Sequence, residues 1–132
     1  MPEPIVFISR FSIKEGNLDQ VKELAHAVSA DIQASKPRTL VYLSYLDAAG
    51  HTVSFLHAFA DADSMDRHFE GAGDRSRAAY EFVEPRGWEV YGTPSDEALE
   101  MLRRAAASAG TSLTIQPEYL AGFLRADGAS VD

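Results

Sequence analysis

The segment from His51 to Phe69 constrains the fold most, because its apolar residues change period at Asp61. Before Asp61 the side chains alternate between two faces, as they do along a β-strand. One of these faces carries His51, Val53, Phe55, His57 and Phe59. After Asp61, one arc of a helical wheel collects Met65, His68, Phe69 and Ala72. The segment therefore predicts a strand that leads directly into a helix, with His57 and His68 facing a pocket between the two.

The size and charge of the chain limit the classes of protein to which it can belong. Its 132 residues are enough for one domain with a core of its own. The formal net charge of −8 argues against a nucleic-acid-binding protein and against adhesion to anionic membranes. There is no apolar run of transmembrane length and no signal-peptide pattern, so we expect a cytoplasmic protein. The absence of cysteine excludes thiolate catalysis, iron–sulfur clusters and thiolate-bound zinc.

Apolar periodicity and turn signals divide the chain into a core and a C-terminal extension. In the core, residues 4–93, we expect strands at 4–12, 39–46, 51–60 and 86–93, and helices that begin near 17, 61 and 74, the last ending at 83. Asn17 and Gln20 resemble a capping box. The extension, residues 94–125, is predicted to hold a helix from Ser95 to Gly110 and short strands at 113–116 and 122–125. Residues 1–125 thus form a single domain, and 126–132 a flexible tail.

The order strand, helix, strand, strand, helix, strand predicts an α+β fold of the ferredoxin-like, split βαβ type (βαββαβ). In this fold an antiparallel sheet carries its helices on one face, and the other face is open. Here the open face would still bear apolar side chains, for example Leu56, Ala58 and Tyr91. Because large exposed apolar patches usually mark interfaces, we expect a homodimer joined through the open sheet faces.

Three short motifs surround the predicted strand-to-helix junction: Phe59-Ala60-Asp61, the acidic helix start Asp63-Ser64-Met65-Asp66, and the histidine of Asp66-Arg67-His68-Phe69. With the order of elements over residues 4–93, they make the chain similar to the dimeric α/β-barrel superfamily and, within it, to the antibiotic biosynthesis monooxygenase-like proteins. The segment Trp88–Ser95 and the helix after it look like a branch of this group with a C-terminal extension. The superfamily includes oxygenases, isomerases, haem-degrading enzymes, stress proteins and ligand-sensing domains, so the fold alone does not name a reaction.

The resemblance implies a cofactor-independent monooxygenase that acts on an aromatic, quinol or polyketide-type small molecule without flavin, haem or metal. Members of the group deprotonate an electron-rich substrate, and the anion itself reduces oxygen. We assign His57 as the candidate base and His68 as the orienting or anion-stabilising group, because burial can tune a histidine pKa near neutrality. The candidate walls for a flat substrate are Phe55, Phe59, Phe69 and Trp88.

A structural role for the same histidines stays open. His57 would then donate to a backbone carbonyl, and His68 would fill a gap where helix and sheet meet. The protein would in that case be a non-catalytic small-ligand-binding or stress-response module of the same fold. His51 begins its strand beside a turn and His26 lies off the apolar stripe of its helix, so both are expected to face solvent.

Other chemistries fit the sequence poorly. Gly71-Ala72-Gly73 begins like a dinucleotide loop, but Ser76 stands where the third glycine belongs. The run that starts at Asp61 begins like a calcium loop, but Met65 occupies a ligand position. The acids here are better explained as helix caps. The histidines and carboxylates form no recognised metal-binding pattern, and we expect no metal.

A haem-degrading enzyme is a further alternative. Such relatives would need an asparagine near the first helix, a tryptophan and a helix histidine. The chain offers residues of these types in Asn17, Trp88 and His68. However, Asn17 is expected to cap a helix and Trp88 lies on the last core strand, which departs from the haem pattern.

Overall fold

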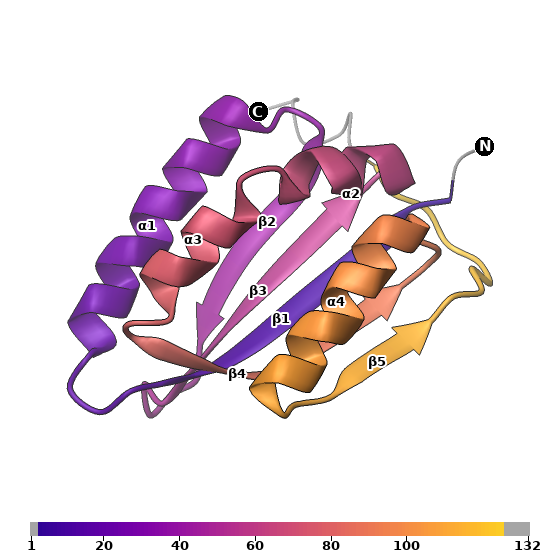
Figure 1. Cartoon of the computed structure of the whole chain (residues 1–132). Coiled ribbons are helices and arrows are strands. Elements are labelled where there is room, and N and C mark those ends of the chain that lie inside the picture. The colour runs from indigo at the N-terminus through magenta and orange to yellow at the C-terminus, as the bar shows by residue number, and fades with distance from the viewer. Residues whose placement is uncertain (1–2, 126–132) are drawn as a thin grey trace.

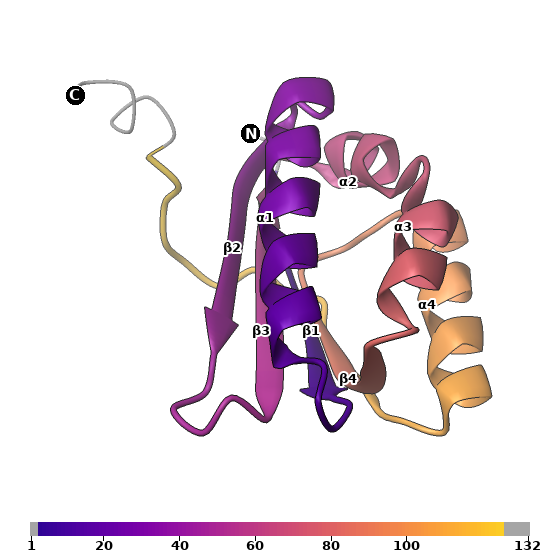
Figure 2. The ribbon, with the colours of Figure 1, turned by 90° about the vertical axis from the view of Figure 1, so that its left-hand side faces the viewer.

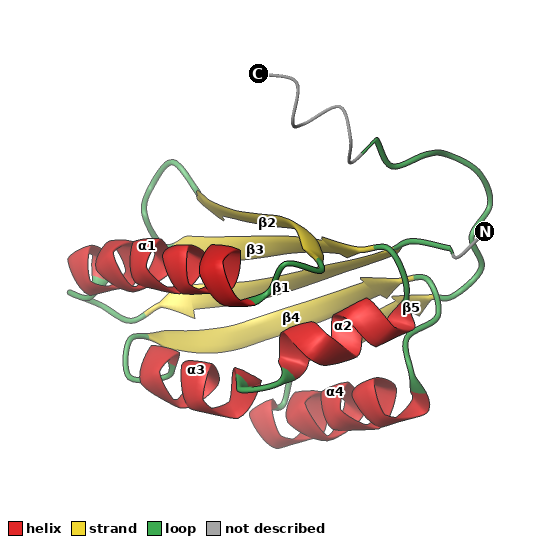
Figure 3. Cartoon of the chain, turned by 90° about the horizontal axis from the view of Figure 1, so that it is seen from above, coloured by secondary structure: helices red, strands yellow, loops and turns green. Residues whose placement is uncertain are grey.

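The computed structural model describes residues 3–125, which form a five-stranded sheet with four helices on one face (Figures 1 and 3). In chain order the elements are β1 (Ile5–Ile13), α1 (Leu18–Ser35), β2 (Thr39–Leu46), β3 (Thr52–Phe59), α2 (Ala62–Phe69), α3 (Ala72–Ala79), β4 (Val83–Tyr91), α4 (Asp96–Ala109) and β5 (Leu113–Gln116). Because every helix packs on the same side, one face of the sheet is covered and the other is open.

The strand order β2-β3-β1-β4-β5 confirms the predicted ferredoxin-like α+β fold. The first four strands are antiparallel to their neighbours, with β1 between β3 and β4. β5 adds to the edge of the sheet in parallel with β4. A parallel neighbour requires a crossover connection, and α4 supplies it. The C-terminal extension is therefore an integral part of the sheet and its helical layer.

The core strands and helices lie close to their predicted positions, with differences at the ends. Asn17 is the N-cap of α1, but its side chain makes no capping hydrogen bond, so the predicted capping box with Gln20 is wrong. Gly71 separates α2 from α3 with a φ of +81°, a conformation that glycine adopts without steric cost. β4 starts at Val83 instead of 86, and the preceding helix is correspondingly shorter. The prediction missed that Pro85 lies where the β1–β4 register shifts, a position that tolerates the missing N–H of proline.

The extension agrees with its prediction except at its end. Ser95 caps α4, its Oγ accepting from the backbone N of Ala98 at 3.1 Å, and Gly110 ends the helix with φ of +66°. The strand predicted at 122–125 is wrong, because Pro117 ends the sheet pairing and the chain then leaves the sheet. The tail predicted at 126–132 lies outside the described residues.

The core lies between the sheet and its helices and has two parts. The larger cluster of buried residues comprises Ile5, Phe7, Phe59, Met65, Trp88, Val90, Leu102 and Ala106. A smaller cluster around Val21, Val53 and Val83 packs under α1. Between the two clusters the layers do not close completely, and the pocket described below occupies this space.

The open face of the sheet and the segment that follows β5 expose apolar side chains. On β2, Leu43 is 46% exposed and Tyr45 58% exposed. Residues 117–125 run on the side of the sheet opposite the helices (Figures 2 and 3), and Leu120 and Phe123 there are 96% and 78% exposed. None of the helices within residues 3–125 is both long enough and apolar enough to cross a membrane.

Candidate functional site

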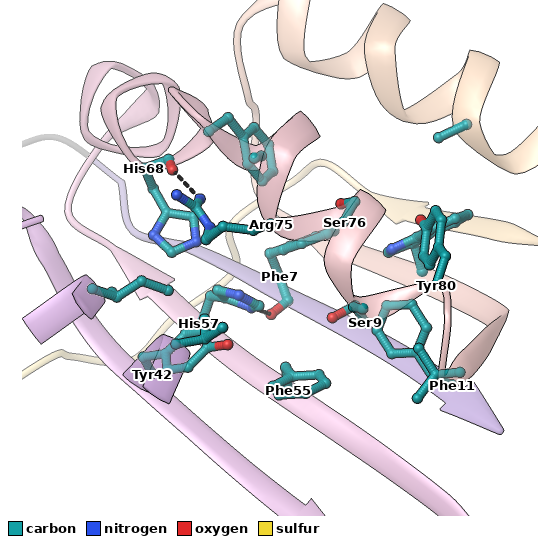
Figure 4. A pocket seen from close by; sticks show the side chains of 18 of the residues that line it. Phe7, Ser9, Phe11, Tyr42, Phe55, His57, His68, Arg75, Ser76 and Tyr80 are labelled. Carbon is teal, nitrogen blue, oxygen red and sulfur yellow. Dashed lines mark hydrogen bonds between the residues drawn. The ribbon is translucent and has the colours of Figure 1, made fainter. Parts of the chain in front are cut away.

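A pocket of about 350 Å³ lies between the helix-bearing face of the sheet and helices α1, α3 and α4 (Figure 4). This volume is within the range of small-molecule sites. Strands β1, β2 and β3 form the floor through Phe7, Ser9, Tyr42, Phe55 and His57. Most of the lining is aliphatic or aromatic, so the few polar groups that face the pocket determine its chemistry.

His57 projects from the middle of β3 into this pocket and is 5% exposed. Its Nδ1 lies 3.0 Å from the backbone oxygen of Phe7 on β1. A carbonyl can only accept, so Nδ1 carries the hydrogen and the lone pair of the neutral ring is on Nε2. No hydrogen bond joins Nε2 to another residue in the range 3–125. His57 therefore has the fixed tautomer and the available nitrogen that a general base needs.

His68 projects from α2 toward the same pocket, so the two predicted histidines are brought together. Their ring centroids are 4.9 Å apart with an interplanar angle of 79°. The Nδ1 of His68 lies 2.7 Å from the hydroxyl oxygen of Thr39, the first residue of β2. This hydroxyl can donate or accept, so it orients the ring of His68 without fixing its tautomer.

Both histidines are neutral at neutral pH. Burial, reinforced by the nearby charge of Arg75, lowers the pKa of His57 to about 4, against the opposing hydrogen bond to Phe7. Burial also lowers the pKa of His68 to about 3, with contributions from His57, Arg75 and Lys36. Each cationic form loses hydration in the pocket and gains no described carboxylate partner. The site therefore presents two neutral imidazoles that can hydrogen-bond to a ligand and that accept a proton only where the resulting cation is stabilised.

Arg75, on α3, is a pocket residue that the sequence analysis did not identify. Its Nη2 donates to the backbone oxygen of His68 at 2.7 Å, and its Nη1 donates to that of Glu70 at 3.3 Å. These bonds hold the guanidinium beside His68 (Figure 4). The signal for Arg75 was present in the sequence, because Ala72, Arg75, Ser76 and Ala79 are spaced as one face of a helix. An arginine on an otherwise small-residue face indicates a polar function for that face.

Tyr42 is a second pocket residue that was not predicted. The centroid of its ring lies 5.0 Å from that of His57 in an edge-on arrangement and 5.9 Å from that of Phe55 in a stacked arrangement. Burial raises the pKa of Tyr42 to about 12, although the charge of Arg75 acts in the opposite direction. The register of the β2–β3 hairpin places Tyr42 opposite His57. The turn at Gly50 fixes that register, so hairpin geometry could have identified Tyr42.

Of the four aromatic walls expected from the sequence, the structure places three at the pocket. Phe55, Phe69 and Trp88 line it. Phe59 is fully buried behind the histidines, 5.1 Å from the ring of His68, and belongs to the core instead of the pocket wall. Alternation along β3 correctly put Phe59 on the helix-bearing face, but it could not show that α2 closes over this end of the strand. His51 and His26 are exposed, as expected.

The alternative sites considered from the sequence are not assembled. Asp61 caps α2 through bonds of 2.8 and 2.7 Å to the backbone N and hydroxyl of Ser64. Within residues 3–125, no three His, Asp or Glu side chains are grouped to hold a metal. Asn17 is not among the residues that line the pocket, whereas His68 and Trp88 are, so the set of residues considered for haem is not brought together.

Comparison with solved structures finds a similar fold in other proteins. MupZ from Pseudomonas fluorescens matches with a TM-score of 0.69 at 17% sequence identity, over 92% of this chain and 95% of its own. SnoaB, a cofactor-independent oxygenase from Streptomyces nogalater, matches with a TM-score of 0.57 at 14% identity, over 70% and 95%. A proposed antibiotic biosynthesis monooxygenase from Bacteroides thetaiotaomicron matches with a TM-score of 0.54 at 17% identity, over 61% and 80%.

The chain shares the ferredoxin-like fold of these proteins. No protein-family model and no curated protein matches the sequence. The 92% coverage in the match with MupZ extends beyond the four-stranded core, which means that the C-terminal helix and strand take part in that likeness. The TM-scores establish a shared fold, but at these sequence identities the chemistry must be argued from the pocket of this chain.

Proposed function

We propose that the protein is a cofactor-independent monooxygenase that oxidises an electron-rich aromatic, quinol or polyketide-type small molecule. The observation that carries the proposal is the state of His57. Its tautomer is set by the Phe7 carbonyl, and Nε2 has no partner among the described residues in a pocket walled by aromatic rings. The shared fold with SnoaB, which is itself a cofactor-independent oxygenase, supports this assignment.

In the proposed reaction His57 Nε2 removes a proton from an activated C–H or O–H group of the substrate. The resulting anion is electron-rich enough to transfer one electron to O₂, and recombination of the two radicals forms a C–O bond. The peroxide takes a proton and then loses water, leaving a carbonyl. For a methylene substrate the balance is R₂CH₂ + O₂ → R₂C=O + H₂O. The protein contributes the base and the orientation of a flat substrate.

The pKa of His57 places a condition on this mechanism. A base whose pKa is lowered to about 4 accepts a proton only if the product ion pair is stabilised. The substrate anion formed beside the new imidazolium provides part of that stabilisation, because opposite charges attract strongly at low dielectric. His68, with its ring close to that of His57, can hydrogen-bond to the same anion.

The test is oxygen uptake with a panel of hydroquinones and anthrones. We expect uptake above the uncatalysed background for at least one compound class, and a loss of about 10²–10⁴-fold in kcat for His57→Gln. The His68→Ala variant should also lose activity, whereas the exposed His51→Gln control should not. Equal background rates for the wild type and both pocket variants would overturn the proposal.

A second candidate function is a non-catalytic module that binds small aromatic ligands. The observation that favours it is that both histidines already make structural hydrogen bonds, to the Phe7 carbonyl and to Thr39. In that case aromatic ligands should raise the melting temperature by mass action while no oxygen is consumed and no product appears. Thermal shift and oxygen uptake on the same compounds separate the two functions.

We also propose that the protein is a homodimer joined through the open sheet faces. The open face combines apolar side chains with polar ones, which include Ser54 between Arg10 and Tyr45 and the internal pair of Arg10 and Glu89, whose Nε and Oε2 are 2.6 Å apart. Leu43 and Tyr45 on β2 expose apolar surface on this face, and the exposed Leu120 and Phe123 lie in the segment after β5, on the same side of the sheet. A second copy offers the same apolar surface, and self-complementary patches form two-fold dimers. Sedimentation should give a dimer at micromolar concentration, and a Leu43→Lys variant should give a monomer; a wild-type monomer would refute this.

A further inference from the structure

We infer that the pocket binds its ligand as an anion, and that Arg75 is the residue that recognises the anionic oxygen. The ligand class is a planar aromatic compound that carries a carboxylate or an ionised phenol or enol. The inference rests on the pocket of the proposed function and specifies its substrate class. It does not depend on whether the bound compound is oxidised.

The first support is the unusual set of partners of Arg75. Its hydrogen bonds within residues 3–125 go to the backbone carbonyls of residues 68 and 70, which position the guanidinium but leave its charge uncompensated. No described carboxylate lies within 4.0 Å of it. Arg77 on the same helix differs, because it pairs with Asp74. A guanidinium has five N–H donors, so Arg75 keeps donors for a ligand.

The second support is the surroundings of this charge. Arg75 is only half-exposed and lines a pocket whose other walls are mainly apolar or aromatic. The positive charge of Arg75 acts to lower the pKa of His57, His68 and Tyr42, because it disfavours the histidine cations and favours the tyrosine anion. A cation in an apolar setting is costly unless it is paired, and a ligand oxygen that carries negative charge would supply the pair.

The third support is the position of Arg75 relative to the aromatic floor of the pocket. Figure 4 shows Arg75 on the α3 side of the pocket and His57, Tyr42 and Phe55 on the floor. A flat ligand can therefore lie against the aromatic floor with its anionic oxygen toward α3. Guanidinium groups bind planar oxyanions in a bidentate manner, which would also fix the rotation of the ligand over His57.

The experiment measures equilibrium binding of two ligands of nearly equal shape, 2-naphthoate and 2-naphthamide, by calorimetry at pH 7.5. The wild type should bind the carboxylate at least about tenfold more tightly than the amide, as expected for a charge-assisted hydrogen bond. Arg75→Gln should lose this preference, and the matched control Arg77→Gln should keep it. Arg75→Lys, which keeps the charge, should retain a reduced preference.

The wild-type comparison alone keeps the inference falsifiable, since it holds even if Arg75→Gln loses the bonds that join α2 to α3 and fails to fold. Equal affinity of the wild type for the two ligands, or a preference that persists in folded Arg75→Gln, would overturn it. Binding of 2-naphthol at pH 7.5 and at pH 10 distinguishes an ionised phenol from a carboxylate as the preferred anion. A preference for the carboxylate without oxygen uptake would support anion recognition by Arg75 and refute the proposed oxygenase activity. Oxygen uptake without that preference would support the oxygenase activity and refute anion recognition by Arg75.

Discussion

Protonation of the two buried histidines should make the protein less stable as the pH falls below 6.5. An unfolded histidine has a pKa near 6.5, whereas in the folded state the pKa of His57 is lowered to about 4 and that of His68 to about 3. The unfolded state therefore binds more protons between pH 6.5 and 4, and stability decreases as the pH falls through that window. Above pH 6.5 both states are neutral at these positions and no such loss occurs.

The magnitude follows from the difference in proton binding. At pH 5 an unfolded histidine is almost fully protonated, while His57 in the folded state remains almost fully neutral. The loss of unfolding free energy is then 2.303RT times the distance from pH 6.5, or about 2 kcal/mol for His57 alone. His68 acts in the same direction, so the wild type should release close to two protons on folding at this pH.

Urea unfolding at pH 7.5, 6.5, 5.75 and 5.0, at one fixed protein concentration, measures this dependence. Trp88 is the only tryptophan and is 6% exposed, which makes its fluorescence a direct probe of the core. The variant His57→Gln should lose about one proton of the slope between pH 6.5 and 5, and His51→Gln should retain the full wild-type slope. If His57→Gln and the wild type show parallel pH profiles, the assignment of a buried neutral His57 is wrong.

Two further predictions concern the backbone. Gly92→Ala should destabilise the fold by about 1–3 kcal/mol, because φ is +110° and the new Cβ would lie 2.9 Å from the backbone oxygen of Pro4. Gly73→Ala, in α3, should instead stabilise the fold by about 0.5–1 kcal/mol, because the new Cβ would meet only the Nη1 of Arg77, at 3.9 Å. Urea midpoints of the two variants check the opposite signs. Ser95→Ala removes the hydroxyl that accepts from Ala98 and donates to Asp66, and should cost about 1 kcal/mol or more by the same assay; Ser95→Thr, which keeps the hydroxyl, should be close to wild type.

The sequence was sufficient for the fold because its local signals agree with one another. Alternation along residues 51–60, the change of period at Asp61 and the glycine at 71 each specify one element, and the order of elements then specifies the sheet. The errors fall where a local rule has an exception. Pro85 was taken to mark the boundary of a strand, and the structure places it inside one, at the register shift opposite Phe11.

The site was only partly predictable because it depends on how elements pack. Helical and strand periods were enough to direct His57 and His68 toward each other. They could not show that α2 covers Phe59 or that the short α3 turns Arg75 toward the same space. Arg75 in particular follows the break at Gly71, and the direction of a helix after such a break is set by tertiary contacts.

Helix α3 has a consequence for how the pocket fills and empties. None of its eight residues is buried, although several of them line the pocket. Elements with few buried contacts have low free energies of local opening. A ligand would give α3 the packing partner that it lacks and would engage Arg75, whose bonds to the end of α2 hold the two helices together. The same segment would thus admit the ligand and, once occupied, exchange its amide hydrogens more slowly than in the free protein.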